Sequence, residues 1–313
     1  MSNRFINPYI DNNMRRKKDI IKWQLGYYND PAFPTAPPAD FIYPNPKKKI
    51  DEDQPHVTWI NHCSFMIHMD GLNILTDPIW GERCSPFSFF GPKRQHNPPI
   101  DLDELPKIDL VLISHDHYDH LDEWTVKRLF RRFPDIQWVV PLRLKKWFEK
   151  RGMIKVIGLG WWQRGKIGSL TVTAVPCQHF SGRGLFDSDR TLWVGYVVES
   201  EKKRMYFVGD TGYNPYDFKM IGEAFKSMDL SLIPIGTYVP HKFMDPVHID
   251  PSKATAIHQE VGSKLSVGMH WMTFRLSGEN QHQPPYDLYL SMQEADLDPI
   301  DFRILEPGQT INW

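Results

Sequence analysis

The sequence lacks several features that would place it in a specialised class of protein. It contains three cysteines among 313 residues, and because they are odd in number and scattered, no disulfide framework is predicted. No stretch approaches the roughly 20 consecutive apolar residues that span a bilayer, and the N-terminus lacks the apolar core of a signal peptide. The formal net charge of -1 provides no general attraction for nucleic acid. We therefore expect a globular chain in a reducing, cytoplasmic setting.

Proline and basic residues gather in the N-terminal stretch. The prolines between positions 31 and 46 prevent long helices and favour extended, polyproline-like structure. Two basic runs, Arg15–Lys18 and Lys47–Lys49, either form a solvated surface or are attracted to anionic lipid headgroups. We predict a proline-rich basic arm, residues 1–55, that wraps a catalytic domain, residues 56–313.

The most informative segment runs from residue 108 to residue 120. Its first part, Ile108–Ile113, is an apolar run rich in branched side chains, which predicts a short buried strand. Three histidines and an aspartate follow at H-x-H-x-D-H spacing, namely His115, His117, Asp119 and His120. A tight turn can bring such side chains together, and their nitrogen and oxygen atoms are ligands for zinc, iron or manganese. A polar loop rich in histidine is the alternative, but tight spacing at a strand end favours a metal site.

Three later segments repeat the same pattern of a buried strand, a small or sharp turn, and a metal-competent side chain. The predicted strands cover 170–175, 204–208 and 264–267, and they lead to His179, Asp210 and His270. Active sites of layered α/β folds collect at strand ends, where rigid elements hold the loops in place. Four coincidences of this kind in one chain predict a centre with two metal ions.

The remaining pattern alternates strands with helices, which predicts an α/β sandwich. A strand over 57–69 and another over 72–75 would form a hairpin at the turn Asp70-Gly71. Asp122 is suited to cap a helix with a buried stripe of Leu121, Trp124, Leu129, Phe130 and Phe133. Asp250 and Pro251 would begin a later helix that ends near Gly262. The other predicted elements are a strand, a helix and a strand at 138–140, 142–150 and 155–157.

An aromatic loop interrupts this alternation. Phe87, Phe89 and Phe90 lie between proline and glycine residues, and two cations, Lys93 and Arg94, follow them. The loop either packs on the body of the protein or forms a membrane-facing lip. We expect it to pack, because exposed rings are unfavourable unless they bind something.

Several short segments, taken in order with the metal motif, resemble one known family. They are Trp59–Ser64, Leu75–Pro78, Gly91–Arg94, Gly209–Tyr213, Ile233–Gly236, His248–Pro251 and the pair His270-Trp271. The H-x-H-x-D-H motif resembles the metal signature of the metallo-β-lactamase superfamily, and the set resembles its N-acylphosphatidylethanolamine-hydrolysing phospholipase D family. The resemblance runs from about Trp59 to the C-terminus. It implies an αββα sandwich of two mixed sheets flanked by helices, with the metal site at strand ends.

The resemblance also implies a role for each candidate ligand. One ion would take His115, His117 and His179, the other would take Asp119, His120 and His270, and Asp210 would bridge both. Asp77, at the end of another strand, could orient a ligand imidazole through its second ring nitrogen. Zinc is the favoured metal, and iron or manganese fits the same ligands. Because ligand histidines must be neutral, metal and activity should be lost together below about pH 5.

The activity that the resemblance implies is a phosphodiesterase of the phospholipase D type. It would convert N-acylphosphatidylethanolamine to N-acylethanolamine and phosphatidic acid by attack of a metal-bound hydroxide, with catalytic roles for Asp210, Asp119 and His248. Tyr118, His62 and His248 are the expected substrate contacts, although His62 could instead support a metal ligand. A phospholipid substrate implies a cytoplasmic protein that associates peripherally with membranes. The resemblance further implies a homodimer, and no nucleic-acid partner is expected.

A metal-dependent hydrolase of a lactone, an ester or a soluble phosphodiester is the alternative function. Asn61 and Cys63 stand where the family usually has glycine and alanine. The loop at 181–187 is extended and could reshape an acyl pocket. A catalytically inactive lipid-binding scaffold is disfavoured, because all seven ligand positions are intact. Cys177 is expected to be packed core rather than a ligand, and His258 is expected to be structural.

Overall fold

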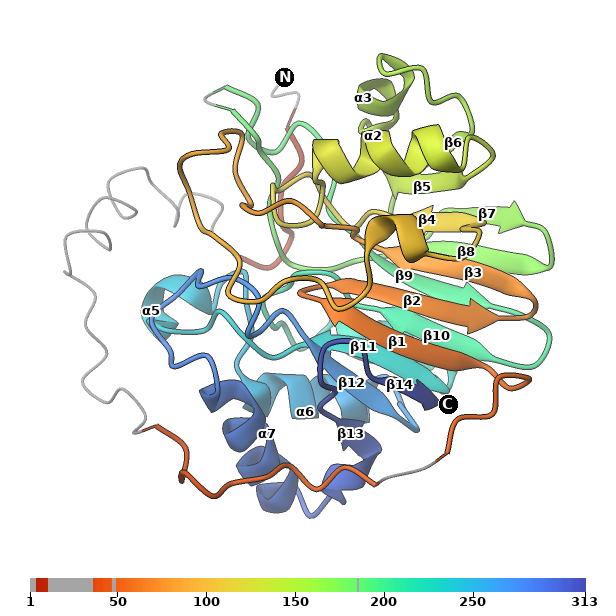
Figure 1. Ribbon diagram of the computed structural model, residues 1–313. Helices are drawn as coiled ribbons and strands as arrows, with labels where there is room; N and C mark the ends of the chain where they lie inside the picture. The colour runs from red at the N-terminus through yellow and green to blue at the C-terminus, as the bar shows by residue number, and fades with distance from the viewer. Residues whose placement is uncertain (1–3, 11–35, 47–48, 185) are drawn as a thin grey trace.

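Two seven-stranded β-sheets pack face to face, and helices cover their outer faces (Figure 1). The computed structural model describes residues 4–10, 36–46, 49–184 and 186–313. The two sheets with their flanking helices confirm the predicted αββα sandwich. None of the helices in these described ranges is both long and apolar enough to cross a membrane.

The first sheet contains both antiparallel and parallel pairs. In spatial order its strands are β14 (Thr310–Asn312), β1 (His56–Asn61), β2 (Ser64–Met69), β3 (Leu72–Thr76), β4 (Leu110–Leu112), β5 (Gln137–Pro141) and β6 (Val156–Leu159). The pairs from β14 to β3 are antiparallel, and those from β3 to β6 are parallel. Helices α2 (Glu123–Arg132) and α3 (Lys145–Glu149) connect the parallel strands and lie on the outer face (Figure 1).

The second sheet is mixed in the same way. In spatial order its strands are β13 (Phe302–Arg303), β12 (Ser266–Met269), β11 (Leu230–Pro234), β10 (Arg204–Phe207), β9 (Gly195–Glu199), β8 (Leu170–Val175) and β7 (Arg164–Ile167). The pairs from β7 to β10 are antiparallel, and those from β10 to β13 are parallel. Its helices are α4 (Asp217–Phe225), α5 (His241–Met244), α6 (Pro251–Glu260) and α7 (Gln283–Glu294). The strand predicted at 170–175 has those bounds, whereas the one predicted at 264–267 begins only at Ser266.

The strand before the metal motif is buried on both faces. Leu110 and Leu112 belong to the core between the sheets, whereas Val111 packs with Val126 and Leu129 under helix α2. Alternate side chains of a strand point to opposite faces, so a strand with a core on each side has an unbroken apolar sequence. This explains why the apolar run before His115 predicted a strand correctly.

The segment predicted as one strand over 57–69 is two strands, β1 and β2, so that part of the prediction is wrong. The chain reverses at His62 and Cys63, and His62 has a φ of +44°. This turn has no glycine or proline, and distant contacts hold it instead. The backbone N–H of His62 donates to Thr273 Oγ1 at 2.7 Å, and its carbonyl accepts from the backbone N–H of His270 at 3.1 Å. The predicted hairpin at residues 70–71 is present between β2 and β3.

Helix α2 begins as predicted, because the Asp122 side chain accepts from the backbone N–H of Trp124. The predicted buried stripe is partly wrong. Leu129 is buried, but Trp124 is 48% exposed, and Val126 takes a core position that the prediction omitted. Trp124 lies on the outer side of the first turn, where its ring packs under the Arg128 guanidinium. Helix α6 also begins as predicted, with the Asp250 carboxylate accepting from the backbone N–H of Lys253.

The aromatic loop does not pack on the body, contrary to our expectation. Phe87, Phe89 and Phe90 are 53%, 80% and 71% exposed. The base of the loop is anchored instead by Arg94, whose buried guanidinium donates to the carbonyls of Ile79 and Gly81. A buried cation satisfied by backbone carbonyls can hold the base while the tip of the loop remains in solvent.

Two segments of the predicted arm, residues 4–10 and 36–46, contact the body. The basic residues Arg15–Lys18 and Lys47–Lys48 lie outside the described residues. Near the N-terminus, Asn7 Nδ2 donates to the carbonyl of His179 at 2.7 Å. In segment 36–46, the Tyr43 hydroxyl donates to the carbonyl of Phe302 at 2.6 Å. Both contacts join residues far apart in the chain, so these segments are part of the folded domain.

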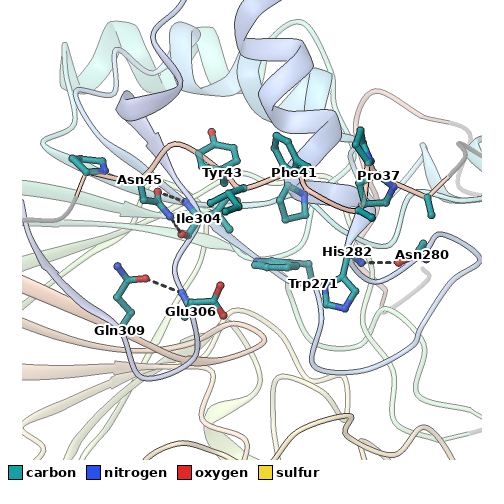
Figure 2. Close-up of a pocket in the computed structure, with 16 residues that line it drawn as sticks. Pro37, Phe41, Tyr43, Asn45, Trp271, Asn280, His282, Ile304, Glu306 and Gln309 are labelled. Atoms are coloured by element: carbon teal, nitrogen blue, oxygen red, sulfur yellow. Dashed lines mark hydrogen bonds between the residues drawn. The ribbon is translucent and has the colours of Figure 1, made fainter.

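Segment 36–46 also forms one wall of a groove of about 620 Å³ (Figure 2). The opposite wall comes from the start of α7 and from the loop before β14, with Trp271 between them. Trp271 follows the predicted ligand His270 directly and stacks on Trp59, with ring centroids 5.3 Å apart. Segment 36–46 therefore lies beside Trp271, the residue that follows the predicted ligand His270.

We expect the Tyr43→Phe substitution to destabilise the protein. It removes the buried hydroxyl that satisfies the carbonyl of Phe302, and an unsatisfied buried carbonyl costs about 1–2 kcal/mol. Urea denaturation should show a lower midpoint with an unchanged slope. Tyr289→Phe is the matched control, because that hydroxyl takes part in an exposed hydrogen bond, and its effect should stay within about 0.5 kcal/mol. Equal stability of Tyr43→Phe and the parent would show that segment 36–46 does not anchor to β13 through this bond.

Candidate metal centre

The predicted ligands converge because the strands that carry them end at the same edge of the sandwich. The loop after β4 carries the H-x-H-x-D-H motif, and β8, β10 and β12 lead to His179, Asp210 and His270. The turn into Asp210 requires Gly209, which has a φ of +69°. A Cβ at Gly209 would lie 2.9 Å from Ser114 Cβ and 3.0 Å from the carbonyl oxygen of Val194. The sharp turns between strand and ligand therefore have a steric basis.

The first ligand group consists of three imidazoles. His115 Nε2 lies 2.8 Å from His117 Nδ1, which in turn lies 3.2 Å from His179 Nε2. Burial lowers the pKa of His115 well below its ordinary value, and the neighbouring imidazoles lower it further. Burial also lowers the pKa of His117. Neutral imidazoles whose nitrogens converge on one point form a donor set for a divalent cation.

The second ligand group combines two imidazoles with two carboxylates. Asp210 Oδ2 lies 3.2 Å from His120 Nε2 and 3.1 Å from His270 Nε2. Asp119 Oδ2 lies 3.3 Å and 3.6 Å from the same two nitrogens. Asp210 Oδ2 is also 3.7 Å from His179 Nε2, so Asp210 lies between the two groups. The structure thus brings together all seven predicted ligands.

The side-chain atoms of the second group fit a metal ion better than they fit one another. Among the described residues, His120 Nε2, His270 Nε2 and Asp210 Oδ1 have no hydrogen-bond partner of acceptable geometry. Buried polar atoms without partners are rare in folded proteins and call for an explanation. Coordination of a divalent cation explains all three, and nitrogen with carboxylate oxygen suits zinc, iron or manganese.

Charge within the second group is strongly coupled. Burial alone would raise the pKa of Asp210, but His120 and His270 hold it well below the usual range of a carboxyl. Asp119 is affected in the same way, chiefly through His120. Conversely, burial would lower the pKa of His120, but Asp210 and Asp119 raise it well above its ordinary value. For the protein groups by themselves, protonated imidazoles therefore provide the positive charge that a metal ion would otherwise provide.

Two ligand imidazoles, those of His120 and His179, are oriented by a hydrogen bond at Nδ1, the nitrogen that faces away from the ligand group. Asp77 Oδ2 lies 2.7 Å from His120 Nδ1, which is the arrangement predicted for Asp77. Ser114 donates to Asp77 through both its backbone N–H and its hydroxyl. His179 Nδ1 donates to the carbonyl of Val247 at 2.8 Å. Such contacts fix the tautomer and the direction of the ligand nitrogen.

The predicted substrate contacts occupy three different environments. His62 is buried, and its Nε2 lies 3.1 Å from Asp119 Oδ2, so it supports a ligand. Tyr118 donates its hydroxyl to the carbonyl of Arg183, whose guanidinium lies 4.0 Å from the Tyr118 ring centroid. The His248 side chain is 12% exposed, and its Nδ1 lies 3.9 Å from Asp210 Oδ2. Of these three, His248 is therefore the partly exposed residue that lies beside the shared ligand Asp210.

Two residues that shape the site were not predicted from the sequence. Asp116, inside the metal motif, accepts hydrogen bonds from the backbone N–H of Gly182 and from Thr191 Oγ1. Arg183 donates to the carbonyls of Asp116 and Leu121. Together they attach Gly182, Arg183 and Thr191 to the motif. The extended loop was visible in the sequence, but its attachment depends on contacts between residues more than 60 positions apart.

The two structural residues expected beside the site are found as predicted. Cys177 is 2% exposed and belongs to the core between the sheets. His258 is buried within α6, and its Nδ1 lies 2.8 Å from Ser266 Oγ. Neither residue lies in a ligand group among the described residues.

We expect metal affinity to rise with pH up to about pH 9. Burial lowers the pKa of His270, but Asp210 and Asp119 outweigh it and raise this pKa to about 9. Below that pH a metal ion must displace a proton from His270, so each pH unit should raise affinity about tenfold per proton released. Chelator competition at several pH values measures this slope.

The metal-stripped protein should show the opposite trend in stability. A histidine with a raised folded-state pKa stabilises the fold below its unfolded pKa of about 6.5, and this stabilisation is lost as the pH rises through about 9. Thermal unfolding of stripped and metal-loaded protein over this range tests the sign. Affinity that is independent of pH between about 7 and 9 would contradict the coupling of His270 to the carboxylates.

Comparisons with known proteins agree with this centre and this fold. The sequence profile of the beta-lactamase superfamily domain matches residues 72–271. N-acyl-phosphatidylethanolamine-hydrolyzing phospholipase D 1 of Caenorhabditis elegans is 38% identical over 263 residues, which cover 80% of this chain and 74% of that protein. An uncharacterized protein of Mycobacterium tuberculosis is 36% identical over 307 residues, covering 95% of this chain and 79% of that protein.

A solved structure supports the fold independently. Igni18, a metallo hydrolase from the archaeon Ignicoccus hospitalis, matches with a TM-score of 0.61 over 83% of this chain and 98% of that chain, at 22% sequence identity. Similarity at this level of identity shows the architecture alone. With the profile match, the relatives and the converged ligand groups taken together, the chain belongs to the metallo-β-lactamase superfamily of metal-dependent hydrolases and, within it, to the N-acylphosphatidylethanolamine-hydrolysing phospholipase D family.

Proposed function

We propose that this protein is a dinuclear phosphodiesterase that hydrolyses N-acylphosphatidylethanolamine to phosphatidic acid and an N-acylethanolamine. The observation that carries the proposal is the 38% identity over 80% of the chain to a protein named for this activity. The complete set of seven ligands in two adjoining groups supports the same chemistry. A soluble phosphodiester, a lactone or an ester is the alternative substrate on the same centre.

The two ligand groups suit the charge of a phosphodiester. Two divalent ions, most simply zinc, would activate water and offset the negative charge of the phosphoryl oxygens. Asp210 lies between the groups and would hold both ions at a fixed separation, while Asp119 is held by His62. Because His248 is partly exposed beside Asp210, it can donate a hydrogen bond to a phosphate oxygen or a proton to the departing alkoxide.

Exposed aromatic side chains near the centre support a lipid substrate. Phe87 and Trp124 line one hollow, and Trp124 lines the next one together with Tyr118 and Arg183. Tyr118 directly follows the ligand His117 in the sequence, so the second hollow is lined by a residue of the metal motif. Exposed apolar patches mark surfaces that bind a partner. We take the exposed rings of Phe87, Phe89, Phe90 and Trp124, the aromatic rim, to contact a membrane that presents the substrate.

Product analysis tests the bond that is cleaved. Purified, metal-loaded protein should convert N-acylphosphatidylethanolamine in detergent to phosphatidic acid and N-acylethanolamine, identified by mass spectrometry. Asp210→Asn should reduce turnover by a factor of about 10³ or more, because it removes the charge that both ligand groups share. Asp109→Asn is the control, since Asp109 directly precedes β4, whereas the metal motif follows that strand. Its carboxylate accepts a hydrogen bond from the backbone N–H of Asn73. If the metals are bound and this lipid is not cleaved, the substrate assignment is wrong and lactones or soluble phosphodiesters become the candidates.

Vesicle binding tests the aromatic rim. Replacing Phe87, Phe89 and Phe90 with serine should weaken co-sedimentation with phospholipid vesicles by at least about tenfold. Each of these exposed rings would contribute about 1.5–3 kcal/mol to the binding free energy when it is buried in the bilayer. Ile42→Ser is the control, since Ile42 is 85% exposed on segment 36–46 rather than on the rim. Unchanged binding of the triple serine variant would exclude the rim as the membrane contact.

A further inference from the structure

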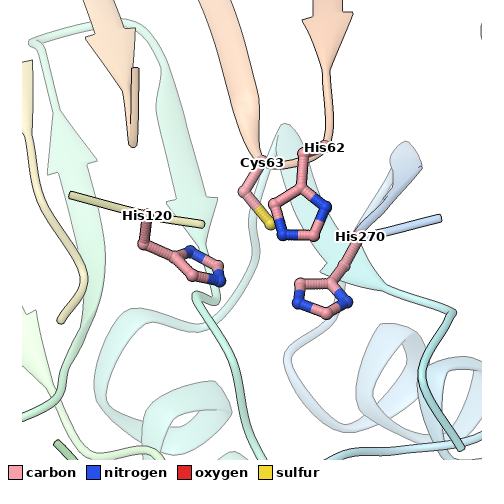
Figure 3. A group of neighbouring side chains, drawn as sticks. All are labelled: His62, Cys63, His120 and His270. Atoms are coloured by element: carbon pink, nitrogen blue, oxygen red, sulfur yellow. The ribbon is translucent and has the colours of Figure 1, made fainter. Parts of the chain in front are cut away.

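A cysteine thiol lies against the second ligand group, outside the set of seven ligands. Cys63 is at the turn between β1 and β2 and is fully buried. Figure 3 shows its sulfur directed toward the rings of His62, His120 and His270. One ligand atom from each of these four residues lies within 4.8 Å of the other three.

The spacing of these atoms is close to that of a tetrahedral metal site. An ion bound to one sulfur at about 2.3 Å and three nitrogens at about 2.0–2.1 Å keeps its ligands about 3.5 Å apart. Side-chain movements of about 1 Å would bring the four atoms to that spacing. All four residues are 2% exposed or less, so an ion held here would be shielded from water.

A second observation points to a ligand at this position. His120 Nε2 and His270 Nε2 are buried and have no hydrogen-bond partner of acceptable geometry among the described residues. The His62 ring directs Nε2 toward this group, where it also contacts Asp119. Buried ring nitrogens without partners beside a thiol are explained if they and the thiol bind a cation.

We propose that His62, Cys63, His120 and His270 form a second, thiolate-containing metal site that overlaps the hydrolytic centre and takes a thiophilic divalent cation such as cadmium. The hydrolytic groups offer nitrogen and carboxylate oxygen, whereas this site replaces the carboxylates with sulfur, which softer ions prefer. On binding, the Cys63 S–H bond is replaced by a sulfur–metal bond, and the proton leaves to solvent.

Occupation of this site competes with hydrolysis because the two sites use the same imidazoles. His120 and His270 would bind either the thiolate-containing ion or the ion that Asp119 and Asp210 hold. A softer ion held by Cys63 therefore displaces the hydrolytic ion of the second group and leaves His115, His117 and His179 in place. The predicted consequence is inhibition by thiophilic cations with release of about one zinc ion per chain.

Cadmium titration of the full chain loaded with zinc tests the proposal. Thiolate-bound cadmium absorbs in the ultraviolet through sulfur-to-metal charge transfer, and a chelating dye reports the zinc that is released. Because the chain contains three cysteines, the Cys84→Ala/Cys177→Ala variant has Cys63 as its single thiol. We expect this variant to develop the charge-transfer band and to release zinc as the parent does.

The Cys63→Ala variant provides the matched test. It should lack the band, and the cadmium concentration that releases half of the zinc should rise by at least about tenfold. Absence of the band in the variant with Cys63 as its single thiol would overturn the proposal, as would persistence of the band in Cys63→Ala. Neither readout requires a lipid substrate, so failure here is distinct from failure of the proposed hydrolysis.

Discussion

The architecture of the site depends on one buried carboxylate, that of Asp210. It is 2% exposed, and a charge in such a position is tolerated only when cations or hydrogen-bond donors surround it. Imidazoles from three separate loops approach it, namely His120, His179 and His270. The strands that carry these loops must therefore end at one edge of the sandwich. Gly209 makes that arrangement possible, since a side chain there would collide with Ser114.

The ligands are in turn held by groups from distant segments of the chain. Asp77, at the end of β3, connects His120 to Ser114, and the backbone of Val247 orients His179. On the N-terminal side, Asn7 binds the carbonyl of His179. Rigid support of this kind reduces the reorganisation required when the reaction occurs. By contrast, Phe87, Phe89 and Phe90 in the aromatic loop are exposed to solvent.

The overlap of two donor sets places a limit on metal selection in this centre. His120 and His270 can complete a set with carboxylates or, under the proposal made here, one with the Cys63 thiolate. Binding affinity alone does not select a metal in such a case. Softer ions bind more tightly to sulfur and harder ions bind more tightly to carboxylate oxygen, so each kind of ion has a favourable donor set in this centre. A thiol directly beside a hydrolytic centre therefore links activity to the identity of the available cations.

Local signals in the sequence indicated an α/β sandwich and the metal-competent side chains that converge at one edge of it. An apolar run with a core on each side is recognisable without the structure, and the H-x-H-x-D-H spacing carries its own chemistry. Caps such as Asp122 and Asp250 were also readable, because a cap bonds within its own first turn. Resemblance to a family then related these local signals to one αββα sandwich.

Tertiary structure alone decided the features that rest on distant contacts. The turn at His62 has no glycine or proline, and its conformation follows from bonds to Thr273 and His270, more than 200 positions away. Whether Phe89 packs or remains in solvent depends on whether another element covers it, which a loop sequence does not encode. The position of Cys63 beside the second ligand group follows from the same turn. Sequence by itself thus determined which residues can bind metal, whereas packing decided which side chains share the centre, because spatial proximity across a sandwich has no local signature.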